Sequence, residues 1–550
     1  MVTGGVLKDA LISGANNIKK YCQLINELNV FPVPDGDTGT NMYMTVNLAA
    51  KEIAVVDDDL SIGEISKIFA DALLRNARGN SGVILSLIFR GFSKHMIGKE
   101  IASVQDFSLA LDLGVKTVYD VVMKPTEGTI LTVARRAAEE SVNFLDINDI
   151  GEFWSKICVI ASETLDLTPT MLPVLKQAGV VDAGGKGLLV IFQGMLSVFK
   201  DNIIIDREEN EECSLSEAGT FAYHTSEDIK FRYCTEFLIM KENLLNEVIK
   251  LRAYLESIGD SVVVVDAEEI IKVHAHTNDP GKAITMSLQY GSLTNIKIDN
   301  MKEQYNNKPK SISKFLDNNN SVFQYVPIDN NREFGFVAIS AGEGIYKLFK
   351  DLGVDNIVNG GQTMNPSTDD ILSAIHATPA KTVFVLPNNK NIIMAAEQAI
   401  HMADRNVCVL QSRTIPQGLS AMLVFDPKSS FEDNRMEMTK GIDKVSTGHI
   451  TFAARDSDFD GYKIKSNDIL AFSNGKLVFV GKTPNKACIR LIKNMLTKDS
   501  SFITILYGAD IREDQAEELK NLVKSKYGDN LEINIIYGGQ PVYYYIISVE

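Results

Sequence analysis

The segment Phe31–Asn41, FPVPDGDTGTN, constrains this chain of 550 residues more than any other feature. Two carboxylates, Asp35 and Asp37, flank one glycine just before a pattern that predicts the start of a helix. Oxygen ligands of this kind suit Mg²⁺, which keeps several waters and completes its shell with substrate phosphates. The polar residues after Asp37 add donors where a helix N-terminus favours anions. A plain surface turn has the same composition, so this segment alone leaves both interpretations open.

Composition limits the class of protein. The length favours about three domains, and a hydrophobic content of 45% with 23% charged residues is typical of globular proteins. A net charge of −16 argues against nucleic-acid binding, because the chain would repel phosphate backbones. We expect no signal peptide and no membrane span, since no basic leader or apolar run of about 18 residues occurs. Six cysteines without paired spacing are typical of a reduced, cytoplasmic protein.

The chain divides into regions of different pattern. Residues 1–205 show apolar positions at helical spacing, and an acidic linker follows at 206–217. Residues 218–305 predict a small α+β domain, and the polar stretch 306–331 is a second linker. Residues 332–550 alternate short apolar strands with helices, which indicates an α/β domain with a parallel sheet. The expected fold class is therefore multidomain.

Individual elements of the middle and C-terminal regions can be predicted. In the middle region we expect a strand, a helix, two strands and a helix that Asp279 caps with Pro280 at its first position. These elements fall at 231–239, 242–258, 261–266, 270–277 and from 280 onward. In the C-terminal region the expected strands are 335–340, 382–386, 407–410, 502–507, 531–537 and 542–547, with a helix at 512–527.

Three strand-to-helix turns of the C-terminal region are polar and glycine-rich. Ligands generally bind at the carboxyl ends of strands in open α/β sheets, where such turns lie. The turns are Ser340–Gly344, Asn359–Ser367 and Pro387–Asn391. None of them contains an evident catalytic pair.

Four predicted helix starts in residues 1–205 contain glycine and are the candidates for ligand binding. They are Asp35–Asp37, Arg78–Gly82, Glu127–Thr129 and Val181–Gly187. Each one alone is also an ordinary helix cap, and the last lacks the spacing of a Walker loop. Their occurrence together in one helical domain indicates a nucleotide site, because backbone N–H groups at helix starts bind phosphate.

These motifs closely resemble the nucleotide-binding L subunit of dihydroxyacetone kinase, an all-α helical barrel that binds ATP through two Mg²⁺. The proline-rich segment before Asp35, on a long chain of three predicted domains, resembles the ATP-binding component of bacterial fatty acid kinase. That resemblance covers essentially the whole chain. It implies transfer of the ATP γ-phosphoryl to a fatty-acid carboxylate, presented by a separate fatty-acid-binding carrier protein, to give acyl phosphate for phospholipid synthesis. It also implies a homodimer.

The resemblance assigns roles to particular residues. Asp35 and Asp37 would be the magnesium ligands. The family pattern has a third aspartate where this chain has Val30, so Asn29 would offer a neutral oxygen instead, and the number of magnesium ions stays open. The residues implied to bind the nucleotide are Asn29, Thr38, Gly39, Thr40, Asn41, Gly79, Asn80, Ser81, Gly82, Thr129, Asp182 and Gly184.

The middle region has a second candidate site. His274 and His276 are two residues apart on one predicted strand, so they share a face, as do Cys234 and Glu236 on another. If these strands pair, the cluster suits Zn²⁺. A cysteine nucleophile activated by histidine, or a buried cysteine beside two histidines, are the alternatives. The resemblance to fatty acid kinases favours a functional role for Cys234, His274 and His276, with zinc preferred over the nucleophile.

Residues 332–550 resemble the DegV-like fold of fatty-acid-binding proteins, which implies a docking platform for the carrier. The sequence therefore predicts an ATP- and Mg²⁺-dependent phosphotransferase. A dihydroxyacetone-type kinase is the alternative within the same class. A non-catalytic nucleotide-sensing or lipid-binding scaffold is the alternative from another class.

Overall fold

The computed structural model describes most of the chain. It leaves out residues 30–35, 123–124, 206–232, 242–250, 252–253, 256–257, 267–269, 301–322, 362–364, 454–456, 460–461, 466, 499 and 529–530. The described residues form two compact units, 1–214 with 323–550 and, separately, 215–322. The predicted linker 206–217, residues 306–322 of the predicted linker 306–331, and most of the predicted helix 242–258 fall on residues outside the description. None of the described helices combines the length and apolar character that a bilayer crossing needs.

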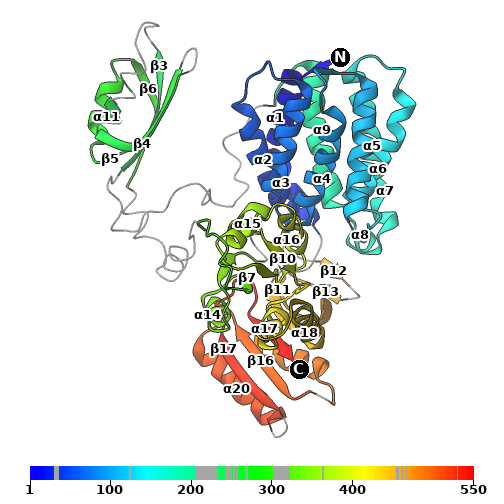
Figure 1. The fold of residues 1–550 in the computed structure, drawn as a ribbon, viewed down its shortest axis with the longest axis vertical. Helices are drawn as coiled ribbons and strands as arrows, with labels where there is room; N and C mark the ends of the chain where they lie inside the picture. The colour runs from blue at the N-terminus through cyan, green and yellow to red at the C-terminus, as the bar shows by residue number, and fades with distance from the viewer. Residues whose placement is uncertain are drawn as a thin grey trace. The chain divides into compact units, whose positions relative to one another are not determined.

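The first 205 residues are helical, as predicted (Figure 1). Each long helix packs on the next, and the last returns to the first, so the ring closes into a barrel. One short strand pair, β1 (Val2–Thr3) with β2 (Ile101–Ala102), joins the segment before the first helix to a loop of the barrel. The helices are α1 (Gly4–Leu28), α2 (Thr38–Ala54), α3 (Ile62–Arg75), α4 (Gly79–Met96), α5 (Val104–Val121), α6 (Ile130–Ser141), α7 (Ile150–Met171), α8 (Pro173–Ala178) and α9 (Ala183–Asp201).

Aromatic side chains fill the barrel toward the C-terminal ends of α4 and α9. Trp154 is 1% exposed and packs edge to face on Phe107 and Phe192, with ring centroids 5.9 and 5.1 Å away. Its indole Nε1 donates to the carbonyl of Phe192 at 3.0 Å, so the buried ring keeps its hydrogen bond. The interior is therefore apolar at this end, and the glycine-marked helix starts lie at the other.

The middle unit is a four-stranded antiparallel sheet with one described helix. The strand order is β4 (Gly259–Asp266), β5 (Ile270–Thr277), β3 (Tyr233–Lys241), β6 (Gly291–Asn300). Helix α11 (Pro280–Ser287) begins after Asp279, whose carboxylate accepts from the Lys282 N–H at 3.2 Å. The predicted strands and the predicted cap are confirmed.

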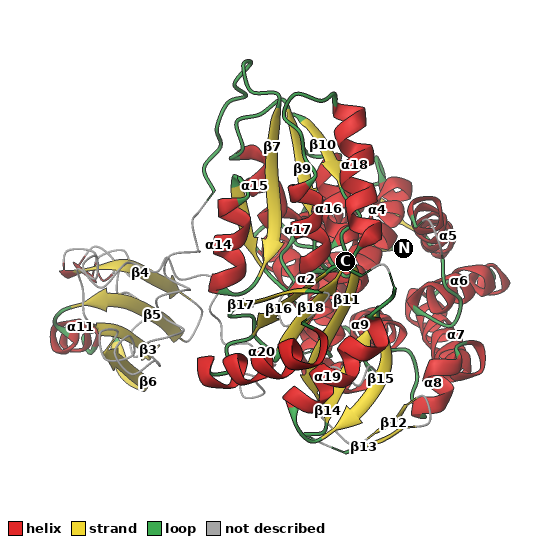
Figure 2. Cartoon of the chain, turned by 90° about the horizontal axis from the view of Figure 1, so that it is seen from below, coloured by secondary structure: helices red, strands yellow, loops and turns green. Residues whose placement is uncertain are grey.

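The described part of residues 334–550 contains two large sheets and a separate two-stranded hairpin (Figure 2). The first is fully parallel, with the order β10-β9-β7-β8, as the alternating pattern predicted. Its strands are β7 (Phe334–Ser340), β8 (Asn356–Asn359), β9 (Thr382–Leu386) and β10 (Asn406–Val409), and its helices are α14 (Glu343–Asp351), α15 (Thr368–His376), α16 (Ile393–Ile400), α17 (Ile415–Leu423) and α18 (Phe431–Lys444).

The second sheet differs from the expected continuation of the parallel pattern. It has six strands in the order β15-β14-β11-β18-β16-β17, and only β16 and β17 run parallel. The predicted strand 542–547 starts late, at Tyr545, because Val542 has a positive φ of 69° in the preceding turn. The strands are β11 (Ser446–Phe452), β14 (Ile469–Ser473), β15 (Lys476–Gly481), β16 (Phe502–Tyr507), β17 (Glu532–Tyr537) and β18 (Tyr545–Val549), with a hairpin of β12 (Ser457–Phe459) and β13 (Tyr462–Ile464) and the helices α19 (Pro484–Met495) and α20 (Glu513–Tyr527).

The helical barrel and the parallel sheet share one buried apolar cluster. Val337 and Ile339 of β7 belong to the same cluster as the barrel interior. Helix α4 packs on α16, and α3 packs on α15. These contacts belong to one compact unit, so the loops at this junction have fixed neighbours.

Candidate nucleotide and metal site

The start of α2 follows the acidic segment directly. Asp37 is the residue before this helix, and its carboxylate does not cap the helix. Asn26 of α1 holds the first turn instead: its amide donates to the Thr40 hydroxyl at 2.9 Å and accepts from the Thr40 N–H at 3.1 Å. A Cβ on Gly39 would lie 2.2 Å from the Cys22 carbonyl, so only glycine allows α1 and α2 to approach this closely. The first turn of α2 is thus fixed by α1 and not by the Asp37 carboxylate.

The start of α4 lies against the start of α2. Gly79 has a φ of +58°, and a Cβ there would be 2.8 Å from Nδ2 of Asn41. Thr45 of α2, fully buried, donates to the Asn41 carbonyl at 2.7 Å and accepts from the Arg78 N–H at 3.1 Å. A Cβ on Gly82 would lie 2.5 Å from the same Thr45 hydroxyl. Two of the four glycine motifs therefore meet directly.

The start of α9 connects the other two motifs. Asp182 caps α9 by accepting from the Gly185 N–H at 2.7 Å, and its own N–H donates to the Thr168 hydroxyl at 3.1 Å. A Cβ on Gly184 would lie 3.2 Å from Cβ of Ile130, the first residue of α6. On the other side, a Cβ on Gly187 would lie 2.5 Å from the sulfur of Met42 in α2. The starts of α2, α4, α6 and α9 are thus linked by close contacts.

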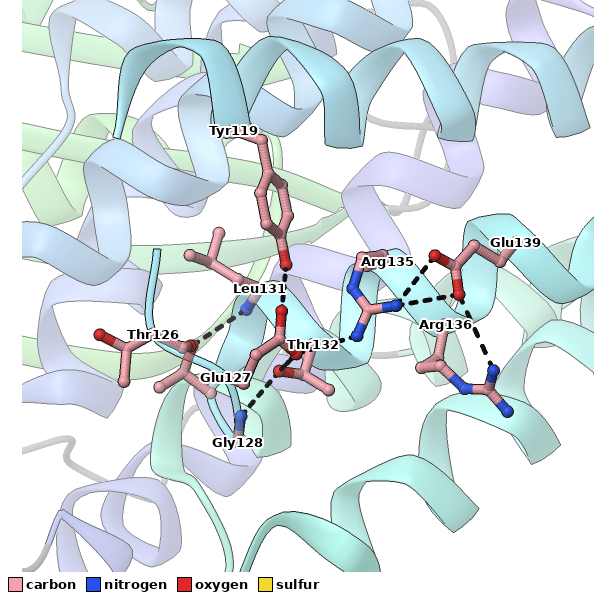
Figure 3. Close-up of polar contacts among 10 residues, drawn as sticks. Tyr119, Thr126, Glu127, Gly128, Leu131, Thr132, Arg135, Arg136 and Glu139 are labelled. Carbon is pink, nitrogen blue, oxygen red and sulfur yellow. Dashed lines mark hydrogen bonds and ion pairs between the residues drawn. The ribbon is translucent and has the colours of Figure 1, made fainter. Parts of the chain in front are cut away.

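A hydrogen-bond network fixes the turn before α6 (Figure 3). The Glu127 carboxylate accepts from the Tyr119 hydroxyl at 3.0 Å and from the Thr132 hydroxyl at 2.7 Å, and it pairs with Arg135 at 2.9 Å. The Thr132 hydroxyl in turn accepts from the Gly128 N–H at 2.7 Å. Partial burial raises the pKa of Glu127, but the bonds from Arg135, Thr132 and Tyr119 outweigh it and hold the pKa below its usual value. The charged network therefore orients Gly128 and the capping residue Thr129.

The structure therefore brings together most of the predicted nucleotide-site residues. The predicted residues Thr38–Asn41, Gly79–Gly82, Thr129, Asp182 and Gly184 all belong to these four helix starts. Asn29 ends α1 beside Gly36, where a Cβ would lie 4.0 Å from the Asn29 carbonyl. Asp35 and Val30 lie outside the described residues. The starts of α2 and α4 are chemically suited to phosphate, because the residue before each helix makes no side-chain cap to its first N–H groups.

Sequence reasoning missed a contribution from the C-terminal domain. Nδ2 of Asn365, on the turn after β8, donates to Oδ2 of Asp37 at 2.6 Å. Arg78 donates through Nη1 to the Asn365 carbonyl at 2.8 Å and pairs with Asp370 at 3.6 Å. The turn Asn359–Ser367 had a readable ligand-binding signal, but only the fold shows that its residues Asn365 and Ser367 contact the helical barrel.

Magnesium would take ligands from this end of the barrel. Among the described residues, no three His, Cys, Asp or Glu side chains converge as a metal site, and Asp35 is not among them. Within the described chain, the buried atoms Asn80 Oδ1 and Asn365 Oδ1 have no hydrogen-bond partner. Neutral oxygens of this kind fit a hard cation or its waters. The donor set therefore fits Mg²⁺, with Asp37 as the described carboxylate.

In the middle unit, the strand register pairs the predicted residues. Cys234 of β3 lies opposite His276 of β5, and Glu236 lies opposite His274. The assumption that these strands pair is confirmed. The side chains of these four residues are outside the description, so the register alone supports the cluster.

The comparisons with known proteins match the whole chain in three parts. A DAK2 domain model matches residues 32–197, which places the helical barrel in a class of kinase domains. The FakA-like models of fatty acid kinase, for the middle and the C-terminal domains, match residues 230–308 and 335–550. "Protein YloV" of Bacillus subtilis is 39% identical over 557 residues, covering 100% of this chain and 99% of its own. The chain belongs to the FakA-like family of fatty acid kinase proteins.

Two solved structures show weaker likeness. The DegV family protein Cg2579 from Corynebacterium glutamicum is 15% identical with a TM-score of 0.32, covering 40% of this chain and 97% of its own. The dihydroxyacetone kinase from C. freundii in complex with AMP-PNP and Mg²⁺ is 17% identical with a TM-score of 0.28, covering 35% of this chain and 33% of its own.

The folding stability should depend on pH through Asp182, and this dependence tests the position of Asp182 at the start of α9. Burial raises the pKa of Asp182 to about 6, although N–H groups of Gly185, Ile130 and Gly184 favour its anion. The folded chain then keeps a proton that the unfolded chain loses near pH 4, so stability from this group falls as pH rises to 6. The loss is up to about 1.4 kcal/mol per pH unit.

We predict that Asp182→Asn removes the decrease in folding stability that Asp182 causes as the pH rises. Thermal unfolding between pH 4.5 and 8 would show a smaller decline for Asp182→Asn than for the unmodified chain. Asp149→Asn, which changes the cap of α7 where Asp149 accepts from the Glu152 N–H at 2.8 Å, is the matched control and should keep the original pH profile. Identical profiles for all three proteins would contradict the burial of Asp182.

Proposed function

We propose that this chain is the ATP-binding kinase component that phosphorylates a fatty-acid carboxylate. The observation that carries the proposal is the close contact between four helix starts, one of them directly after Asp37, in the domain that matches the DAK2 model. Membership of the FakA-like family supports the choice of acceptor. The acid would be presented by a separate fatty-acid-binding protein at the C-terminal domain.

The chemistry requires positioning more than proton transfer. A carboxylate oxygen of the acid attacks the γ-phosphorus, and the bond to the β,γ-bridging oxygen breaks to release ADP. The acid is already ionised at neutral pH, so no general base is needed. Mg²⁺, when bound, neutralises phosphate charge. The described residues would do the rest: Asp37 would hold the metal, and the N–H groups of Gly79, Asn80 and Ser81 would bind phosphate oxygens.

Arg135 and Arg78 lie at or near the helix starts of the site, but both guanidinium groups are already bound to protein acceptors and are therefore less available to bind phosphate. Arg135 is paired with Glu127 and Glu139, both at 2.9 Å. Arg78 is held by the Asn365 carbonyl and Asp370. We therefore propose that both arginines shape the site, and that metal and backbone N–H groups balance the charge on phosphate.

Removing the Asp37 carboxylate should stop the reaction. With ATP, Mg²⁺ and a fatty-acid-loaded carrier, we expect Asp37→Ala to lower acyl phosphate formation, trapped with hydroxylamine, by at least ~100-fold. Asp112→Ala is the matched control, because Asp112 lies on the barrel surface and pairs with Lys116, at 2.6 Å, in an exposed ion pair. Undiminished activity of Asp37→Ala would contradict the kinase site.

The same assay separates the alternatives. Phosphorylation of a small keto-sugar without any carrier would favour a dihydroxyacetone-type kinase. Mg²⁺-dependent nucleotide binding without turnover of either acceptor would favour a nucleotide-sensing scaffold.

For the middle unit we propose a zinc site made by Cys234, His274 and His276. The paired register of β3 and β5 supports it, since it brings the three positions to neighbouring strands. We predict that elemental analysis of the purified protein finds about one zinc per chain, and that Cys234→Ala loses it. Cys408→Ala, which removes a buried free thiol of the C-terminal domain, should retain the metal. A metal-free protein whose activity still needs Cys234 would favour a cysteine nucleophile.

A further inference from the structure

The C-terminal domain reaches the metal motif of the helical barrel through one short segment, residues 365–368. Thr368 donates its N–H to the Ala77 carbonyl at 3.2 Å, and Ser367 forms an antiparallel bridge with Arg78. Asn365 is joined to Arg78 through its carbonyl and to Asp37 through its amide. The contact thus uses backbone and side-chain bonds together, and Asn365 lies 287 positions beyond Arg78 in sequence.

Residues 365–368 are also fixed by interactions within the C-terminal domain. Ser367 caps α15 in a capping box, in which the Asp370 N–H donates to the Ser367 hydroxyl at 3.1 Å and Asp370 accepts from the Ser367 N–H at 2.7 Å. Pro366 restricts the backbone of Asn365 to extended conformations. Asn365 is 1% exposed. Its side chain therefore has little freedom to leave Asp37.

The negative charge of the Asp37 carboxylate fixes the orientation of the Asn365 side-chain amide. An amide oxygen facing the Asp37 carboxylate would repel it, so the nitrogen must point there, as the 2.6 Å contact requires. A hydrogen bond to one carboxylate oxygen limits rotation of the carboxylate plane. Partners of this kind orient metal ligands in many sites and raise the affinity for the metal about 10–100-fold.

The other atom of the amide adds an independent observation. Asn365 Oδ1 is buried and has no hydrogen-bond partner in the described part of the chain. A Cβ on Gly79 would lie 3.4 Å from Nδ2 of the same amide, so this side chain borders the start of α4 as well as Asp37. A buried, unpartnered oxygen at a phosphate-binding helix start indicates that a ligand completes its hydrogen bonding.

We infer that Asn365 is a positioning residue that holds Asp37 for metal binding, so that the C-terminal domain completes the nucleotide site of the helical barrel. This inference rests on the proposed function. It assigns Asn365 a part in the ATP site itself, in addition to any docking of a carrier on the same domain.

The test measures metal-dependent nucleotide binding and needs no acceptor. Mg²⁺ is titrated into the full-length protein with a fluorescent, non-hydrolysable ATP analogue. We expect Asn365→Leu and Asn365→Ala to raise the Mg²⁺ midpoint about tenfold. Asn434→Leu is the matched control: Asn434 is also a 1% exposed asparagine of the C-terminal domain, and its amide donates to the Asp426 carbonyl at 2.8 Å within that domain. Its midpoint should stay within about twofold of that of the unmodified protein, because a distant site without shared partners does not couple to Asp37.

A double variant shows whether the effect runs through Asp37. In Asp37→Asn, which already lacks the charged ligand, adding Asn365→Leu should cause no further loss. An additive loss, or an unchanged midpoint in both Asn365 variants, would overturn the inference and leave the proposed function standing. Absence of Mg²⁺-dependent binding by the unmodified chain would contradict the proposed function, and this inference with it.

Discussion

The candidate site depends on close packing between helix starts that have glycine at the points of contact. Gly79 meets Asn41, Gly184 meets Ile130, and Gly187 meets Met42, each closer than an added side chain would ordinarily allow. These contacts gather the first N–H groups of α2, α4, α6 and α9 at one end of the barrel. The apolar cluster around Trp154 fills the other end. A site for phosphate and metal therefore arises from the packing of the barrel, without a basic surface.

The negative net charge of the chain is consistent with a phosphate site that has no basic surface. With a net charge of −16, general attraction cannot hold a nucleotide. Local dipoles and a metal must do so. Two described cations next to the site, Arg78 and Arg135, are bound to protein acceptors and keep loops in place. In the proposed site, polyphosphate recognition would therefore depend on the metal, and metal binding on the environment of Asp37.

Local sequence signals predicted much of this structure. Helix starts were readable because their caps are local: Asp182, Asp279 and Thr129 each bond an N–H within three residues. Strand β5, Ile270–Thr277, was predicted to the residue. The second C-terminal sheet was only partly predicted, because β18 pairs with β11 and β16, which lie far from it in sequence. One signal there was overlooked: Asn474-Gly475, both with positive φ, is the turn of the β14–β15 hairpin. The contact of Asn365 with Asp37 had no local signal at all.

Hydrogen exchange with and without a non-hydrolysable ATP analogue and Mg²⁺ tests the central claim most directly. The first amides of a helix lack intrahelical acceptors, so they exchange readily until a ligand accepts their bonds. Many amides at these helix starts already donate within the protein, so the account predicts that residues 38–39, 79–81 and 183 gain protection together, with no gain at the opposite end of the barrel. Protection confined to one of these starts, or found elsewhere, would contradict a shared nucleotide site.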